Sequence, residues 1–280
     1  RGGGRSGKMR NRHSFVFYPL VAYAIVVIAP FLWIAGTAFK RQIDILQGKI
    51  IFTPVLSNFR QLFDSREATF LNDLYNSSVI AVSSTALVLV IATAAAFTLQ
   101  RLSMPKWFIN VIFLWVLIFY MLPPITFIGA WFIMADYIGL FNTRFAVILG
   151  HTTINLPLGL WLMATFINEI PKELLEAARV DGCNNRQIFS KVIVPLVKPG
   201  LISTGVIVFI FSWNDFLVAL TLTTKATQTV PVSIATFAQE YEIRYGAMAA
   251  GSFISTIPAL VLLLIGQKYI VKGLLAGAVK

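Results

Sequence analysis

The sequence has little charge, little acid and few metal-binding side chains. Of its 280 residues, 12% are charged, 12 are Asp or Glu, two are His and one is Cys. The single Cys183 excludes an internal disulfide, and His13 and His151 are too far from it in the sequence to support a metal site. Because no paired carboxylates, Ser/His/Asp set or metal-ligand pattern occurs, the sequence argues against a membrane enzyme and predicts no metal site.

Apolar side chains are in excess. They make up 57% of the chain, and the mean hydropathy is +0.77. Such a chain has too few polar residues to cover a soluble globule. The net charge of +11 comes from short basic clusters between apolar runs, which is typical of topology signals rather than of a nucleic-acid surface. We therefore expect an all-α integral membrane protein.

Six apolar segments are long enough to be transmembrane helices. A helix needs about 20 apolar residues to cross the hydrocarbon core, with every backbone polar group bonded internally. Pro19 and Pro30 in the first segment, and Pro123 and Pro124 in the third, predict that these two helices are kinked or broken. The six predicted spans are residues 16–38, 78–99, 107–134, 145–167, 201–223 and 248–270.

The basic residues predict the orientation. With six spans and a cytoplasmic N-terminus, about two thirds of the 23 Lys and Arg residues fall on the cytoplasmic side. The positive-inside rule therefore places both termini and the 168–200 loop in the cytoplasm. Residues 1–15 are expected to be a basic cytoplasmic tail, and residues 16–280 a single transmembrane domain.

The N-terminus has the spacing of a phosphate-binding loop. Residues 2–9, "GGGRSGKM", match G-x-x-x-x-G-K. The Ser or Thr that would bind magnesium is missing, no strand precedes the motif, and a membrane span follows it. We therefore interpret residues 2–9 as tail and expect the chain to bind no ATP and no other cofactor.

The loop at 168–200 interrupts the apolar pattern with two predicted short helices. The first, in "PKELLEAARVDG" at 171–182, begins near Pro171, has Glu173 near its positive end and stops at Gly182. Its apolar residues Leu174, Leu175 and Ala178 are expected along one side. The second helix is expected to be capped by Asn184 or Asn185 and ended by Pro195.

Two interpretations of the first helix follow from the pattern alone. Ala177, Ala178 and Gly182 have almost no side chain, so a partner's groove could close around the backbone while flanking charges orient it. Alternatively, the helix is an amphipathic connector lying against lipid headgroups. The residues themselves do not choose between these alternatives.

The spacing in this loop resembles a known signature. Glu176-Ala177-Ala178, then Gly182, then Pro195 resemble the EAA motif of inner-membrane permease subunits of binding-protein-dependent ABC importers. That family has Ile and Leu where this chain has Val192 and Val194, which keeps the apolar character. Segments starting at Tyr75 and Phe211, and the C-terminal segment from Ala247, resemble the carbohydrate-uptake branch and are similar to the smaller maltose permease subunit.

The resemblance implies the fold, partners and function. It implies a type I ABC importer (maltose-permease-like) fold in the bacterial inner membrane, working with a second homologous permease subunit, two ATP-binding cassette subunits and a soluble substrate-binding protein. ATP and Mg²⁺ would lie on the ATPase, whose closure would move the membrane helices through this loop. The residues expected to couple to the ATPase are Glu176, Ala177, Ala178, Arg179, Asp181, Gly182 and Pro195.

Polar residues inside the spans are candidates for a translocation path that hydrogen-bonds sugar hydroxyls. Asp215 is costly in the bilayer, about 2.5 to 3.5 kcal/mol on insertion scales, so it should face the bundle interior or the outer interface. Each candidate could equally make an ordinary interhelical contact. The candidates are Asn76, His151, Asn155, Asn214 and Asp215. A short outer helix is also expected over residues 58–63, where it could touch the binding protein.

Three functions are compatible with the sequence. The first is a permease subunit that imports a sugar or oligosaccharide. The second uses the same machinery for an anionic oligosaccharide of the uronate type or a glycerophosphate-type cargo, for which the basic outer loops give slight support. The third is a self-contained secondary transporter or channel, which would require inverted repeats or coupled intramembrane charges, and no convincing repeat is evident.

Overall fold

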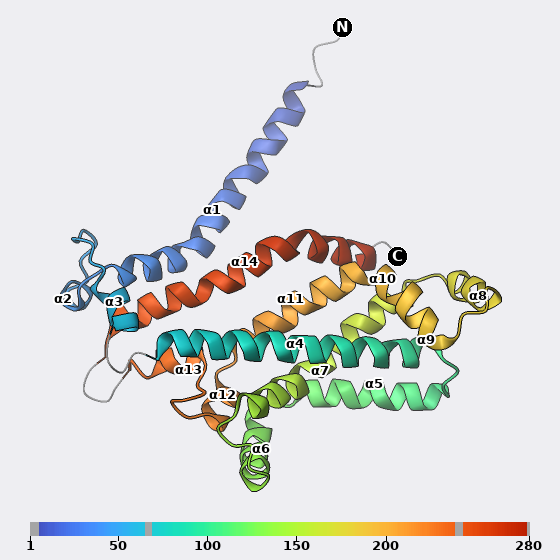
Figure 1. Cartoon of the computed structure of the whole chain (residues 1–280). Helices are drawn as coiled ribbons and strands as arrows, with labels where there is room; N and C mark the ends of the chain where they lie inside the picture. Colours follow the sequence, from blue (N-terminus) through green and yellow to red (C-terminus); the bar gives the residue numbers. More distant parts are fainter. Residues whose placement is uncertain (1–5, 65–68, 239–242, 279–280) are drawn as a thin grey trace. The chain divides into compact units, whose positions relative to one another are not determined.

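The computed structural model describes residues 6–64, 69–238 and 243–278 (Figure 1). Within these ranges the regular secondary structure is helical, and β pairing is limited to an isolated bridge between Ala238 and Ile243. The chain divides into two compact units, one of residues 1–68 and 234–254 and the other of residues 69–233 and 255–280. The helical content confirms the all-α prediction.

The candidate membrane spans agree with the predicted number. Four helices are long and apolar enough, and two bent helix pairs raise the total to as many as six. The four are residues 17–38 of α1 (Ser6–Ala38), α4 (Phe70–Arg101), α7 (Arg144–Asn168) and residues 245–269 of α14 (Tyr245–Ala278). The pairs are α5 (Lys106–Met121) with α6 (Ile125–Tyr137), and residues 185–196 with α11 (Lys198–Asn214).

The third predicted span breaks at its two prolines. α5 and α6 meet at 96°. Leu122, which precedes Pro123, has an extended backbone with φ −75° and ψ 129°, because a proline disfavours the helical conformation of the residue before it. The predicted break is therefore confirmed.

The fifth predicted span, residues 201–223, contains a break that the sequence does not predict. α11 ends at Asn214, Asp215 is extended with φ −66° and ψ 131°, and α12 (Leu217–Leu222) begins after it. The Oδ1 atom of Asp215 accepts hydrogen bonds from the backbone N–H of Val218 at 3.0 Å and of Ala219 at 3.4 Å. These bonds satisfy amides at the start of α12, so the carboxylate stabilises the interruption.

The unit of residues 1–68 and 234–254 contains α1, α2 (Gln42–Leu46) and α3 (Ser57–Asp64). α1 is continuous through Pro19 and Pro30, so it is not broken there, and its backbone is helical from Ser6, inside the predicted tail. α3 confirms the short helix expected at 58–63. Buried Asn58 fixes α3 by donating to the carbonyl oxygens of Ala38 and Lys40, both at 2.8 Å.

In the other unit, α4 packs along α7 and α11. Small residues allow the helices to approach closely: a Cβ added at Gly159 of α7 would lie 2.5 Å from Cγ1 of Val88 in α4. Val88, Met163, Ile167 and Ile193 are fully buried in one core cluster. This close approach at small residues lets apolar side chains from neighbouring helices pack into a defined core.

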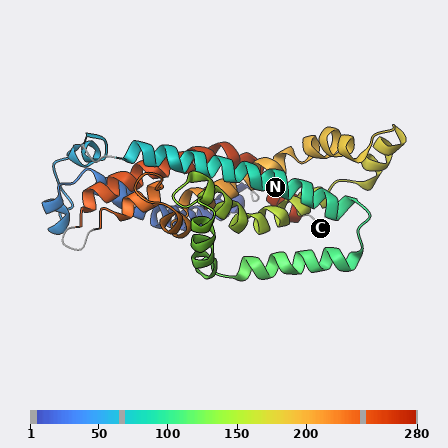
Figure 2. The same cartoon turned by 60° about the horizontal axis from the view of Figure 1, so that its bottom comes forward.

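Four short elements lie at one end of this unit, where α4 ends (Figures 1 and 2). They are α8 (Lys172–Val180), α9 (Asn185–Gln187), the π-helix η1 (Ile188–Ile193) and α10 (Val194–Leu196). α12 lies toward the opposite end, where α4 begins (Figure 1). The 168–200 loop and the α11–α12 break are therefore on opposite sides of the bundle's middle.

Candidate functional site

α8 is a separate helix whose ends follow from its sequence. Pro171 is its N-cap residue, Glu173 lies in its first turn and Arg179 in its last turn, which complements the helix dipole. Gly182 has φ +80°, a left-handed conformation that glycine adopts without strain. The backbone N–H of Cys183 then donates to the carbonyl oxygen of Ala178 at 2.9 Å. The predicted helix, and its end at Gly182, are confirmed.

The two faces of α8 differ. Leu175 and Ala178 are buried, 4% and 8% exposed, and pack in the main core cluster of the bundle. Glu176, Ala177, Arg179, Asp181 and Gly182 are exposed. Of the two alanines in the motif, only Ala177 is therefore open to a partner, while Ala178 gives close packing inside the chain.

The segment after Gly182 anchors α8 to the bundle. Asn184 and Gln187 form a reciprocal capping box: each side chain accepts a hydrogen bond from the other residue's backbone N–H at 2.9 Å. Ile188 and Ile193 of η1 are fully buried, and the ring of Phe189 lies 5.4 Å from that of Phe97 in α4. Movement of this segment would therefore displace α4 through direct side-chain contact.

Pro195 does not end the second helix, contrary to the prediction. It lies exposed inside α10, in that helix's first turn, where the missing N–H of proline costs no hydrogen bond. The chain instead turns after Val197, and residues 185–196 meet α11 at 74°. The preceding π-helix has i→i+5 hydrogen bonds instead of i→i+4 hydrogen bonds. It therefore lacks the regular α-helical pattern that a proline at position 195 would disrupt.

Arg101 connects α4 to the base of α8, a link that the sequence did not reveal. Its guanidinium donates to the backbone carbonyl oxygens of Ile167 and Ile170. Ile167 lies in the last turn of α7, and Ile170 directly precedes Pro171. A positive group at the carbonyl end of a helix is favourable, so Arg101 holds the ends of α4 and α7 together just before α8.

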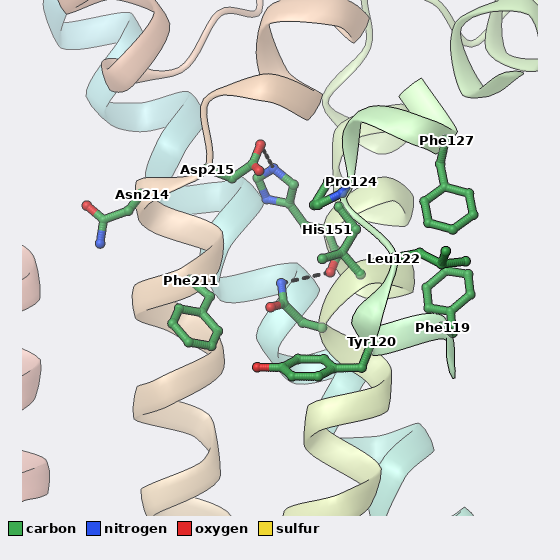
Figure 3. A pocket seen from close by; sticks show the side chains of 11 residues that line it. Phe119, Tyr120, Leu122, Pro124, Phe127, His151, Phe211, Asn214 and Asp215 are labelled. Carbon is green, nitrogen blue, oxygen red and sulfur yellow. Dashed lines mark hydrogen bonds and ion pairs between the residues drawn. The ribbon is translucent and has the colours of Figure 1, made fainter. Parts of the chain in front are cut away.

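A pocket of about 440 Å³ lies between α5, α6, α7 and α11 (Figure 3). It contains four of the five predicted path residues: His151 and Asn155 from α7, Asn214 from α11, and Asp215 from the break after it. Tyr120 extends from α5 toward α11 (Figure 3). The remaining lining residues are Phe119, Leu122, Pro124, Phe127, Ile154 and Phe211.

A chain of polar side chains crosses the helices behind the pocket. His151 is 1% exposed; its Nδ1 lies 2.6 Å from Oγ of Ser212, and its Nε2 lies 3.1 Å from Oδ1 of Asp215. Ser212 Oγ is in turn 2.8 Å from Oγ of Ser84 in α4. These contacts join three helices and fix the carboxylate of Asp215 at the edge of the pocket.

Asn76 lies apart from the pocket. It is fully buried, its Oδ1 accepts from Nε of Arg144 at 2.6 Å, and its Nδ2 donates to the carbonyl oxygen of Gln228 at 3.0 Å. Its side chain therefore holds the 224–229 segment against α4 and α7. Sequence reasoning also missed Tyr120 and Phe211, because aromatic residues are common throughout these spans and no local pattern distinguishes the two that reach the pocket.

The described residues contain no cluster of three or more His, Cys, Asp or Glu side chains that could hold a metal ion. Cys183 is a free, half-buried cysteine beside α8. What the arrangement offers chemically is hydrogen bonding, in the pocket and between the helices.

A helical bundle with an anchored, outward-facing short helix at one end and a pocket that contains polar side chains between its spans is the architecture of a membrane permease subunit. Residues 86–275 match the family described as "Binding-protein-dependent transport system inner membrane component", and the chain belongs to this family. It is a multi-pass inner-membrane protein and a non-catalytic component of an ABC transporter. Membership of this family does not support the self-contained secondary transporter or channel.

Relatives match over almost the whole chain. The chain is 40% identical over 267 residues to the "Trehalose transport system permease protein SugB" of Mycobacterium tuberculosis, covering 93% of this chain and 94% of the relative. It is 35% identical to the "Trehalose/maltose transport system permease protein MalG" of Thermococcus litoralis, with coverage of 93% and 94%. The full-length matches agree with the carbohydrate-uptake branch indicated by the sequence.

Solved structures show the same fold. A chain of a bacterial ABC transporter involved in the import of the acidic polysaccharide alginate superposes with a TM-score of 0.74 at 21% identity, covering 96% of this chain and 99% of that chain. A chain of the MetNI methionine ABC transporter gives 0.59 at 18% identity, covering 73% and 95%. The predicted type I ABC importer fold is confirmed.

Proposed function

We propose that this chain is one permease subunit of an ABC importer that moves a saccharide from a soluble binding protein into the cytoplasm. ATP hydrolysis on a separate subunit would drive the movement through α8. The observation that carries this proposal is the two-sided character of α8. A nine-residue helix is marginal alone in water, and α8 is fixed to the bundle by its inner face while its outer face stays open.

We infer that the α8 end of the bundle is cytoplasmic. The connections at this end are rich in basic residues, which favours the cytoplasmic side under the positive-inside rule. Both termini would then be cytoplasmic, and the α12 end would face the binding protein. The basic residues at the α8 end are Arg101, Lys106, Lys172, Arg179, Arg186, Lys191 and Lys198.

The outer face of α8 has the features that a helix bound in a groove of the ATPase needs. Glu176 would pair with the ATPase, exposed Ala177 would let the partner close onto the backbone, and the turn at Gly182 would position the next segment. Arg179 and Asp181 would orient the partner by charge. Closure of two ATPase domains would move α8 as a rigid body, and η1 and Arg101 would transmit that movement to α4 and α7.

The proposed assembly has a second, homologous permease subunit, two ATPase subunits and a binding protein. ATP and Mg²⁺ would be bound by the ATPase subunits. We assign His151, Asn155, Asn214 and Asp215 to the translocation path on the basis of their shared pocket. Asn76, by its contacts, is assigned to holding the 224–229 segment instead.

The saccharide cargo is supported by the names of the relatives, which refer to trehalose and maltose. Their high coverage means that the same spans and the same loop are present. A saccharide has many hydroxyl groups, and the neutral amides and the phenol of the pocket can hydrogen-bond such groups.

The test is substitution of Ala177 by Trp in the complete transporter. The chain is co-expressed with its partner permease, ATPase and binding protein, and reconstituted in liposomes. We expect Ala177→Trp to abolish saccharide uptake and to release the ATPase on purification, because the large ring blocks close seating of α8. Native mass spectrometry measures the subunits that remain.

The matched control is Tyr137→Trp. Tyr137 is 90% exposed and, like Ala177, lies outside the core. It belongs to α6 rather than to α8. The control should assemble and transport as the unmodified chain does. Normal uptake by Ala177→Trp, with the ATPase still bound, would disprove the proposed coupling.

A further inference from the structure

We infer that the pocket binds the cargo directly and is built for a neutral, hydroxyl-rich saccharide rather than for an anionic one. This inference rests on the proposed import function, and it adds the charge class of the cargo and the atoms that recognise it. The names of relatives leave that class open: alongside trehalose and maltose proteins stands a "Sulfoquinovosyl glycerol transport system permease protein SmoH" of Agrobacterium fabrum, 31% identical, whose named cargo is a sulfonate.

The pocket presents unused hydrogen-bond acceptors. Oδ1 of Asp215 is occupied by His151 and by the N–H groups of Val218 and Ala219, but Oδ2 has no partner among the described residues. Asn155 donates its Nδ2 to the carbonyl oxygen of His151 at 2.9 Å, which leaves its Oδ1 without a partner within the same described part of the chain. Because hydroxyl groups donate hydrogen bonds, both free oxygens suit a saccharide.

Tyr120 supplies a group that can both donate and accept. Its side chain is 53% exposed, and its phenol extends from α5 toward α11, the helix that ends at Asp215 (Figure 3). The hydroxyl makes no hydrogen bond to other described residues. It therefore complements the two acceptors, since a sugar ring offers both O–H donors and oxygen acceptors to its surroundings.

The charge of the pocket opposes an anion. None of the 11 lining residues is Lys or Arg, and Asp215 brings a carboxylate whose side chain is 21% exposed. Placing a uronate or sulfonate beside this carboxylate would juxtapose like charges where no Lys or Arg of the lining compensates. A neutral ligand avoids that penalty and gains charge-assisted hydrogen bonds from its hydroxyls to Asp215.

The size and aromatic content of the pocket fit a small saccharide. Its volume of about 440 Å³ is within the usual range for small-molecule sites, roughly 300 to 1,000 Å³. Phe211 is 47% exposed and lines the pocket with Tyr120, so apolar ring faces are available. The C–H face of a sugar ring is apolar and can pack on such rings while its hydroxyls reach the polar atoms.

The test measures binding to the complete transporter without its binding protein. Radiolabelled trehalose, maltose and diacetylchitobiose serve as neutral probes, and an alginate disaccharide serves as the anionic probe. At least one neutral probe should bind, and the alginate disaccharide should bind about tenfold more weakly or not at all. Binding is measured both without nucleotide and with ATP and vanadate, so that both states of the transporter are sampled.

Three variants assign the binding to this pocket. Tyr120→Phe and Asn155→Leu should each weaken the neutral probe about three- to tenfold, because each removes one hydrogen-bonding partner. Asp215→Asn keeps an oxygen that can cap α12 and accept from His151, so it changes mainly the charge. It should improve binding of the alginate disaccharide about tenfold relative to the neutral probe. Thr153→Val, on α7 but outside this pocket, is the matched control and should bind as the unmodified chain does.

The outcomes separate this inference from the proposed function. Suppose the complex assembles and imports a neutral saccharide, yet no neutral probe binds, or Tyr120→Phe and Asn155→Leu bind normally. The inference is then overturned while the import function stands. It is also overturned if the alginate disaccharide binds as well as the neutral probes, or if Asp215→Asn leaves their ratio unchanged. Failure of the chain to assemble with an ATPase would instead remove the proposed function.

Discussion

At the scale of single residues, Gly159 sets how closely α7 approaches α4. A Cβ at this position would lie 2.5 Å from Cγ1 of Val88, much less than a normal contact. Val88 cannot readily turn away, because a β-branched side chain in a helix has one strongly preferred rotamer. The same close approach recurs at Gly150, where an added Cβ would lie 2.7 Å from Cγ1 of Val218 in α12.

We predict that Gly159→Ala destabilises the assembled transporter by about 1–3 kcal/mol, because overpacking forces the two helices apart. The measurement is thermal unfolding of the purified complex. Val88→Ala combined with Gly159→Ala should recover much of the loss, since Cγ1 is gone. Gly129→Ala is the control, because nothing lies within 4 Å of an added Cβ there. An unchanged melting temperature in Gly159→Ala would contradict the close packing.

The residues of the α8 motif could be named from the sequence, but which of its two alanines a partner can reach could not. Spacing identified Glu176, Ala177, Ala178 and Gly182, and the left-handed φ at Gly182 fits its expected turn. Ala178 is buried while its neighbour Ala177 is exposed, because which side of a short helix faces the bundle depends on tertiary contacts with η1 and the main core cluster. The pocket was also partly predictable, since four of five polar candidates meet there, and Asn76 does not.

At the scale of elements, Arg101 links three helices. It bonds to carbonyl oxygens at the end of α7 and directly before α8, from the last turn of α4. Hydrogen bonds to a charged group contribute about 1.5–3 kcal/mol each. The link therefore stabilises the base of α8 against the bundle, which a transmitting element requires.

We predict that Arg101→Ala uncouples ATP hydrolysis from uptake. α8 should remain helical but lose its fixed position, so amide hydrogen exchange over 170–182 should rise about tenfold. The number of ATP molecules hydrolysed per imported saccharide should increase. Lys106→Ala, at the same end of the bundle, should leave both quantities unchanged. Normal coupling in Arg101→Ala would exclude the link from transmission.

A second element-scale feature is the α2 segment in the unit of residues 1–68 and 234–254. Asp44 has a buried side chain that accepts from Nε of Arg41 at 2.8 Å and from Nζ of Lys49 at 3.2 Å. The hydrogen bond from Arg41 lowers the pKa of Asp44 from its ordinary value of 3.8. The hydrogen bond from Lys49 and the positive charges of Arg41 and Lys49 lower this pKa further. The ionised form is thus favoured in the folded segment.

We predict that this segment loses stability only at acid pH. Because the pKa is lower in the folded state, the stabilisation is present above the ordinary value of 3.8 and is lost as the pH falls through the folded value. Hydrogen exchange over 41–49, corrected for its intrinsic pH dependence, should stay constant from neutral pH to about pH 4 and rise below it. In Asp44→Asn, hydrogen exchange over 41–49 should be high across the whole pH range. A transition near neutral pH would contradict this assignment.

The breaks in the helices were predictable to different degrees. The break between α5 and α6 followed from Pro123 and Pro124, which change the backbone chemistry locally. The break between α11 and α12 did not, because Asp215 is one polar residue in a long apolar run and its capping bonds form only in three dimensions. Hydropathy indicates which segments can enter the membrane. It does not indicate where a side chain accepts a hydrogen bond from a backbone N–H group and so allows a helix to break.

At the scale of the whole molecule, the exposed face of α8 and the pocket that contains His151 and Asp215 lie in different parts of the bundle. α8 and its anchoring segment lie at one end, and the pocket lies where α5, α7 and α11 meet. α4, α7 and α11 connect the two regions. In the proposed mechanism, the ATPase moves α8, and these helices transmit that movement to the pocket.

The most direct measurement of this mechanism is saccharide uptake into liposomes that contain the purified chain and its partner permease, with and without the ATPase subunits. With the ATPase, the binding protein and ATP present, uptake should occur and should stop when ATP is withheld. Without the ATPase, we expect no uptake down or against a gradient. Sustained uptake by the permease chains alone would contradict the mechanism.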